Sequence, residues 1–72
     1  MVPSPTVDFE LNGEKRAASA PLTVLGLLEE FDLAGRRVAV AINSEVVPKS
    51  QFGQRTIRPG DQVEVIHAVG GG

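Results

Sequence analysis

The sequence predicts an α+β fold in which a mixed β-sheet packs against a single helix. Residues 6–18 alternate apolar and polar side chains around an Asn-Gly pair, which indicates a hairpin. Residues 23–31 repeat apolar side chains at helical spacing, and residues 38–67 return to short alternating segments. A helix between the second and third strands requires a crossover, so some neighbouring strands must be parallel.

The hairpin is expected to begin at Thr6. Val7, Phe9 and Leu11 alternate with polar residues and therefore share one buried face. Asn12-Gly13 follows, and this dipeptide readily supplies the two positive φ angles of a tight turn. We therefore expect residues 14–18 to return as an antiparallel strand.

A helix is expected to begin at Thr23, whose hydroxyl can accept a hydrogen bond from a free amide of the first turn. Its apolar face has the spacing i, i+3, i+4 and i+7 and consists of Val24, Leu27, Leu28 and Phe31. Ala34-Gly35 is predicted to end the helix, because glycine readily adopts the left-handed cap.

The second half of the chain predicts three further strands, at residues 38–42, 45–47 and 62–67. Asn43-Ser44 connects the first two of these strands. A single helical turn anchored by Phe52 is expected next, and then a type II turn with proline and glycine at residues 59 and 60.

Composition limits the chain to one small domain spanning residues 1–72. The 72 residues carry a formal net charge of −2, and 42% of them are hydrophobic. There is no cysteine and one histidine, which excludes a disulfide, a thiol nucleophile and a zinc site built from cysteine or several histidines. We therefore expect packing alone to stabilise the core and no metal to be bound.

Several functional classes are not expected. The chain has no run of basic residues and neither tyrosine nor tryptophan, so nucleic-acid binding is not predicted. No apolar stretch approaches the roughly 20 residues of a membrane helix, and no signal peptide is apparent. We expect a cytoplasmic protein.

No catalytic set can be assembled from these residues, so an enzyme is not predicted. His67, the lone imidazole, is interpreted as an ordinary strand residue. The unusual feature is the tail, residues 68–72, where Gly70, Gly71 and Gly72 follow the last strand. Without Cβ atoms such an arm can thread a narrow channel in a partner and present the carboxylate of Gly72. The alternative interpretation is a frayed chain end.

Several short motifs occur in order after Val40. They are Ile42-Asn43, Val47-Pro48-Lys49 followed by Phe52, Gly60-Asp61, and a terminal Gly71-Gly72. Together they resemble the ThiS family, the sulfur carriers of thiamine biosynthesis, and the resemblance covers essentially the whole domain. It implies a β-grasp, or ubiquitin-like, fold with four to five strands over one helix. Phe52 stands where the family often has tryptophan, and Gly70 extends the usual glycine pair to three.

The resemblance implies a reaction cycle at Gly72. A ubiquitin-activating-like adenylyltransferase would adenylate its carboxylate with ATP, and no cofactor would be bound permanently. A persulfide from a cysteine desulfurase or rhodanese-type donor would then displace AMP. The resulting thiocarboxylate would deliver sulfur to a thiazole synthase, and Gly70 and Gly71 would thread the partner's channel.

Partner docking is predicted on the face of the sheet opposite the helix. There the apolar strip consists of Ala39, Ala41, Ile66 and Ala68. Lys49, Arg55 and Arg58 flank the strip or form an ordinary solvated rim. The alternative is a scatter of small residues on a solvated sheet.

Three other functions remain open from the sequence. The small subunit of molybdopterin synthase uses the same tail chemistry, but that family usually has a proline pair before its terminal segment, where this chain has Ile66-His67-Ala68. A ubiquitin-like protein modifier would form isopeptide bonds through Gly72. A passive interaction domain would leave the tail unmodified.

Overall fold

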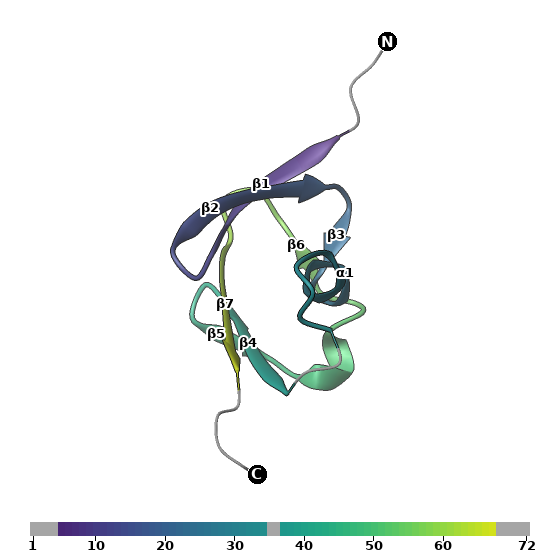
Figure 1. The fold of residues 1–72 in the computed structure, drawn as a ribbon, viewed down its shortest axis with the longest axis vertical. Helices are drawn as coiled ribbons and strands as arrows, with labels where there is room; N and C mark the ends of the chain where they lie inside the picture. Colours follow the sequence, from purple (N-terminus) through teal and green to yellow (C-terminus); the bar gives the residue numbers. More distant parts are fainter. Residues whose placement is uncertain (1–4, 35–36, 68–72) are drawn as a thin grey trace.

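The computed structural model describes residues 5–34 and 37–67. The elements in chain order are β1 (Thr6–Leu11), β2 (Glu14–Ser19), β3 (Leu22–Thr23), α1 (Val24–Glu30), β4 (Val38–Ile42), β5 (Glu45–Val47), the 3₁₀ helix η1 (Lys49–Gln51), β6 (Thr56–Ile57) and β7 (Gln62–His67). Five of the strands form one mixed sheet in the order β2-β1-β7-β4-β5, and α1 packs on one face of it (Figure 1). The pair β1–β7 is parallel and the other pairs are antiparallel. This arrangement confirms the predicted β-grasp fold.

The β1–β2 hairpin forms as its sequence predicts. Asn12 and Gly13 have φ angles of 52° and 83°, the left-handed pair that a tight turn between twisted strands requires. The Asn12 side chain also bonds to the neighbouring strand β7. Its Oδ1 accepts from the Val65 amide at 2.9 Å, and its Nδ2 donates to the Val65 carbonyl at 3.3 Å. This side chain therefore continues the β1–β7 pairing where β1 itself turns away.

Helix α1 begins as expected, with the Thr23 hydroxyl accepting a hydrogen bond from the Gly26 amide at 3.1 Å. Val24, Leu27 and Leu28 are buried against the sheet. No charged residue supports either end of this seven-residue helix, so burial of its apolar face is what stabilises it.

The predicted end of the helix at Ala34-Gly35 is wrong, because α1 ends at Glu30. Asp32 takes the left-handed conformation, with a φ of 59°. The amide of Leu33 then bonds back to the Leu28 carbonyl at 2.6 Å, the pattern of a Schellman cap. Leu33 packs against the core, and this contact favours an earlier stop than a glycine-based prediction gives. Gly35 lies outside the described residues.

The strand pair β4–β5 and the following strand β7 agree with the sequence analysis. Asn43 and Ser44 have φ angles of 52° and 69° and form the tight connection between β4 and β5. Gly60, with a φ of 84°, forms the turn that precedes β7. The small antiparallel pair β3–β6, with Leu22 opposite Ile57, is an addition that the sequence analysis did not predict.

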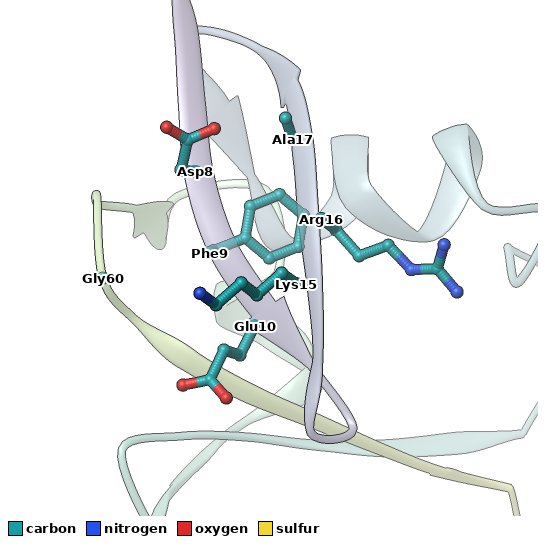
Figure 2. A pocket seen from close by; sticks show the side chains of 7 residues that line it. All are labelled: Asp8, Phe9, Glu10, Lys15, Arg16, Ala17 and Gly60. Carbon is teal, nitrogen blue, oxygen red and sulfur yellow. The ribbon is translucent and has the colours of Figure 1, made fainter.

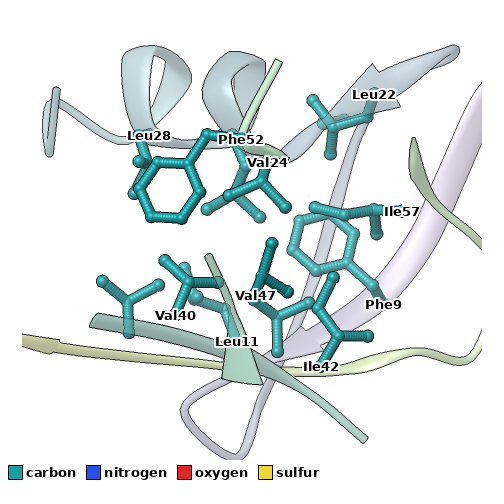
Figure 3. Packing of buried hydrophobic residues seen from close by; sticks show 14 of the residues in the cluster. Phe9, Leu11, Leu22, Val24, Leu28, Val40, Ile42, Val47, Phe52 and Ile57 are labelled. Carbon is teal, nitrogen blue, oxygen red and sulfur yellow. The ribbon is translucent and has the colours of Figure 1, made fainter. Parts of the chain in front are cut away.

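One apolar cluster lies between α1 and the sheet (Figure 3). Its largest fully buried side chains are Leu27, Ile42, Val24, Val40 and Val63. Phe52, just after η1, is also buried, which confirms its predicted role as an anchor. Fifteen of the described residues are apolar and buried, which is enough to form one core, as expected for a domain of this size.

Candidate functional site

The end of β7 fixes the place from which the predicted tail leaves the domain. Ala68, Gly70, Gly71 and Gly72 lie outside the described residues, so their predicted roles stay predictions. His67 is the last described residue, and it lies opposite Val38 at the start of β4. We call this end of the sheet, with Arg37, Val38, Lys49, Ile66 and His67, the tail end. It lies at the bottom of Figure 1.

The face of the sheet opposite α1 brings together Ala39, Ala41 and Ile66, the predicted docking residues that the structure describes. Ala39 lies directly opposite Ile66 in the β4–β7 register, and Ala41 is two residues further along the same face. The Ile66 side chain is 62% exposed. Val46, which is 74% exposed, faces Ala41 from β5 and enlarges this apolar strip.

Val46 was not predicted as part of the strip, although the alternation of side chains along β5 could have indicated it. Val47 is buried, and neighbouring residues of a strand point to opposite faces, so Val46 must point outward.

Two open cavities adjoin the tail end. The first measures about 340 Å³ and lies on the strip side, lined by Arg37, Val38, Ala39, Lys49, Ile66 and His67. The second measures about 370 Å³ and lies on the helix side, lined by Leu25, Leu28, Leu33, Ala34, Arg37, Val38, Lys49, Phe52 and Gly53. Both cavities include Arg37 and Lys49, so these two cations lie where the cavities meet.

The basic residues predicted to flank the strip do not stay together. Lys49 lines the cavity beside Ile66, as the prediction requires. Arg55 and Arg58 instead line a cavity with Asn43 and Asp61 at the opposite end of the sheet. Arg37 was not predicted here, since only the fold shows that the residue before β4 meets the end of β7.

The opposite end of the sheet, with the Asn43-Ser44 turn and the Arg58–Asp61 turn, is held by side-chain hydrogen bonds. We call it the turn end. Asp61 is 9% exposed, and its carboxylate accepts from Asn43 Nδ2 at 3.1 Å and from the Arg58 amide at 2.8 Å. The Asn43 Oδ1 accepts from the Gln62 amide at 3.0 Å. These bonds tie the two turns into one network.

Another cavity, of about 550 Å³, lies along the hairpin (Figure 2). It contains both signs of charge, with Asp8 and Glu10 near Lys15, while Arg16 extends to the other side of β2. Glu10 is opposite Lys15 in the β1–β2 register. None of the predicted site residues lines this cavity.

Two kinds of feature are absent from the part of the chain that the structure describes. Among residues 5–34 and 37–67, no group of three or more histidine, cysteine, aspartate or glutamate side chains is placed to hold a metal ion. Within the same ranges, no helix has the length and apolarity needed to cross a membrane. The candidate site is the surface around the end of β7.

Comparison with known proteins connects this surface to a family. The sequence model of the ThiS family matches residues 6–72. The sulfur carrier protein ThiS of Escherichia coli is 34% identical over 61 residues, which cover 85% of this chain and 92% of the relative. The crystal structure of a thiamine biosynthesis protein (ThiS) from Geobacter metallireducens superposes with a TM-score of 0.78 at 30% identity, covering 92% of this chain and all of that one.

A thiazole synthase of Paramagnetospirillum magneticum is also similar, with 45% identity over 62 residues. The match covers 86% of this chain but 19% of that relative, so this chain spans about a fifth of its length. The family match extends from the first residue of β1 to Gly72 and agrees with the fold, the motifs and the solved relative. The chain belongs to the ThiS family.

Proposed function

We propose that this chain is a sulfur carrier of thiamine biosynthesis that bears its sulfur at the carboxyl group of Gly72. The match of the ThiS family over residues 6–72 carries this proposal, because it includes both the folded domain and the glycine tail. The printed name of the Escherichia coli relative, a sulfur carrier protein, supports a protein cosubstrate whose chemistry is supplied by partner enzymes. A cycle that consumes ATP and a persulfide sulfur would take place in the cytoplasm.

The first step activates the tail. The Gly72 carboxylate attacks the α-phosphorus of ATP in an adenylyltransferase, which forms an acyl-adenylate and releases pyrophosphate. A carboxylate alone does not react with a sulfur nucleophile, because an oxide ion would have to leave; AMP is a far better leaving group.

The second step loads sulfur. A persulfide on a cysteine desulfurase or rhodanese-type donor attacks the acyl carbon, and AMP leaves. A thiol then attacks the donor's sulfur in the resulting acyl disulfide. This attack forms a disulfide with the donor and releases the thiocarboxylate on Gly72. No cofactor bound permanently to the carrier is needed for either step.

The third step delivers the sulfur to a thiazole synthase. The similarity to a segment of a protein named thiazole synthase supports this partner, since the segment matches most of the present chain. Gly70 and Gly71 would thread the partner's channel, and the strip of Ala39, Ala41 and Ile66 would dock beside it. Ala68, in the predicted strip, would continue this surface toward the tail.

The test is mass spectrometry of the chain after incubation with the adenylyltransferase, ATP and a persulfide donor. We expect a mass increase equal to the replacement of one oxygen by sulfur, located at Gly72. A variant that lacks Gly72 should show neither this increase nor AMP release, while its thermal unfolding matches that of the wild type. AMP release by this variant would refute the assignment of Gly72.

The same measurement distinguishes the other functions. Covalent adducts on other proteins would indicate a ubiquitin-like modifier, and an unmodified chain would indicate a passive domain. Sulfur delivery to a molybdopterin precursor rather than to a thiazole synthase would indicate the molybdopterin-synthase small-subunit role.

A further inference from the structure

Two cations at the tail end have no partner in the part of the chain that the structure describes. Arg37 and Lys49 are both exposed, and both line the strip-side and the helix-side cavities. Neither cavity is lined by an acidic residue. The one ion pair within the described residues, Arg16 with Glu14, lies far away on β2. Within its described residues, a chain with a net charge of −2 therefore keeps two cations without an ion-pair partner beside its last strand.

Exposed apolar side chains lie on both sides of this pair. Ile66, which is 62% exposed, lines the strip-side cavity, and Leu25, which is 44% exposed, lines the helix-side cavity. Leu25 is held in place by the backbone, because its amide donates to the Phe52 carbonyl at 2.8 Å. From the strip side to the helix side, the surface therefore runs from the apolar Ile66 across the two cations to the apolar Leu25.

Any enzyme that encloses the residues after His67 must also cover the surface from which they leave. Covering a cation removes its hydration, and this cost is not recovered unless an opposite charge replaces the water. Binding is therefore more favourable when carboxylates of the partner face the two cations. Burial of Ile66 and Leu25 against apolar side chains of the partner stabilises the complex further.

We propose that the tail end binds a segment of the tail-accepting enzyme in which carboxylates that face Arg37 and Lys49 are flanked by apolar side chains in the two cavities. This inference rests on the proposed function only in that a partner encloses the tail. The predicted docking site lies on the face of the sheet opposite α1. The proposal extends that site around the tail end of the sheet to the surface of α1.

The test measures the affinity of the whole chain for the thiazole synthase of the same organism by calorimetry. We expect the double variant Arg37→Glu/Lys49→Glu to bind at least about tenfold more weakly at low ionic strength. The difference should shrink as salt screens the charges. Thermal unfolding verifies that the variant is folded.

A matched control keeps the same net charge but moves the substitutions. Lys15→Glu/Arg58→Glu changes two exposed cations away from the tail end. We expect it to bind within about twofold of the wild type, because general charge repulsion is weak at a distance. Equal weakening in the two double variants would overturn the proposal, and so would unchanged binding of Arg37→Glu/Lys49→Glu.

A third variant tests the helix-side cavity. A Cβ on Gly53 would meet the Leu25 side chain at an ordinary 3.9 Å, and Gly53 lines the helix-side cavity, so Gly53→Leu adds bulk at this cavity. We expect weaker binding with unchanged thermal unfolding. Undiminished binding would overturn the helix-side half of the proposal.

These affinities are independent of sulfur loading. If wild-type chain binds the thiazole synthase but never acquires sulfur, the proposed function fails while the affinities still decide the present inference. If sulfur is transferred and Arg37→Glu/Lys49→Glu binds normally, only the present inference fails.

Discussion

The two ends of the sheet are built in opposite ways. At the turn end, the buried carboxylate of Asp61 is satisfied by Asn43 and by the backbone of Arg58, so polar groups there face one another. At the tail end, Arg37 and Lys49 face solvent without a partner among the described residues, and Ile66 is exposed. The Asp61 carboxylate at the turn end is satisfied internally, whereas the two cations at the tail end have no ion-pair partner among the described residues.

This difference separates two kinds of family motif. Ile42-Asn43 and Gly60-Asp61 contribute strongly to the resemblance, yet both lie at the turn end, where they connect turns. Lys49 of the Val47-Pro48-Lys49 motif lies at the tail end, next to β7. A motif can therefore identify the family because the fold needs it, without taking part in the carrier chemistry.

The largest effect is expected from the tail. Replacing Gly71 with valine adds a β-branched side chain to the segment predicted to thread a narrow channel. We expect sulfur transfer to fall by at least about a hundredfold, as for other misplaced reacting groups. Single-turnover assays with the thiazole synthase measure this, and thermal unfolding should stay unchanged. Normal transfer by Gly71→Val would rule out threading.

The next effect should appear at the turn end and in stability alone. Asp61→Ala removes two hydrogen bonds and leaves the Asn43 amide and the Arg58 N–H without their acceptor. We expect the free energy of unfolding to fall by roughly 2–4 kcal/mol, measured by urea denaturation.

Asp8→Ala, at an exposed position of β1, serves as the control for Asp61→Ala and should change stability by less than about 0.5 kcal/mol. Below its unfolding transition, the Asp61 variant should still be adenylated at the wild-type rate. A large loss of adenylation in the folded variant would mean that the turn end takes part in function.

A smaller effect is expected from the exposed strip. Ile66→Ala should leave stability within about 0.5 kcal/mol, because the side chain is already 62% exposed. Affinity for the thiazole synthase should fall about tenfold, as for a contact residue near the centre of an interface. Val46→Ala, further from the tail, should have less effect. If Val46→Ala weakened binding more than Ile66→Ala, the centre of the docking surface would lie near Val46 rather than at the tail end.

The smallest effect concerns the end of α1. Asp32 has a φ of 59°, a conformation that glycine adopts without steric cost. Asp32→Gly should therefore raise the free energy of unfolding by roughly 0.5–1 kcal/mol, seen as a higher midpoint in urea. Binding should be unaffected, since Asp32 lines neither cavity of the tail end. Destabilisation would mean that the carboxylate itself supports the cap.

The predictability of this fold depends on how local its signals are. Asn12-Gly13 and the Thr23 cap act within a few residues, and the structure confirms both. The pair β3–β6 was not predicted, because two-residue strands are too short to show alternation. The helix end was misplaced because the packing of Leu33, a tertiary contact, decides it.

The residues of the candidate site also divide into those that local sequence signals predict and those that only the fold brings together. Alternation along β4 and β7 was enough to place Ala39, Ala41 and Ile66 on one face. It was not enough to bring Arg37 and Lys49 together, because only the folded chain places the residue before β4 beside the first residue of η1. Gly72 was assigned from the motif of its family, and no contact among the described residues bears on it.

The position of β7 has a mechanical consequence. The strand that leads into the tail lies at the centre of the sheet, between β1 and β4. The Asn12 side chain forms hydrogen bonds with the backbone of Val65 in this strand. A pulling force on the tail loads these bonds together in shear along the strand, rather than peeling an outer strand one bond at a time. Under the proposed function, this arrangement lets a partner enzyme pull on the chain end while the domain keeps its shape.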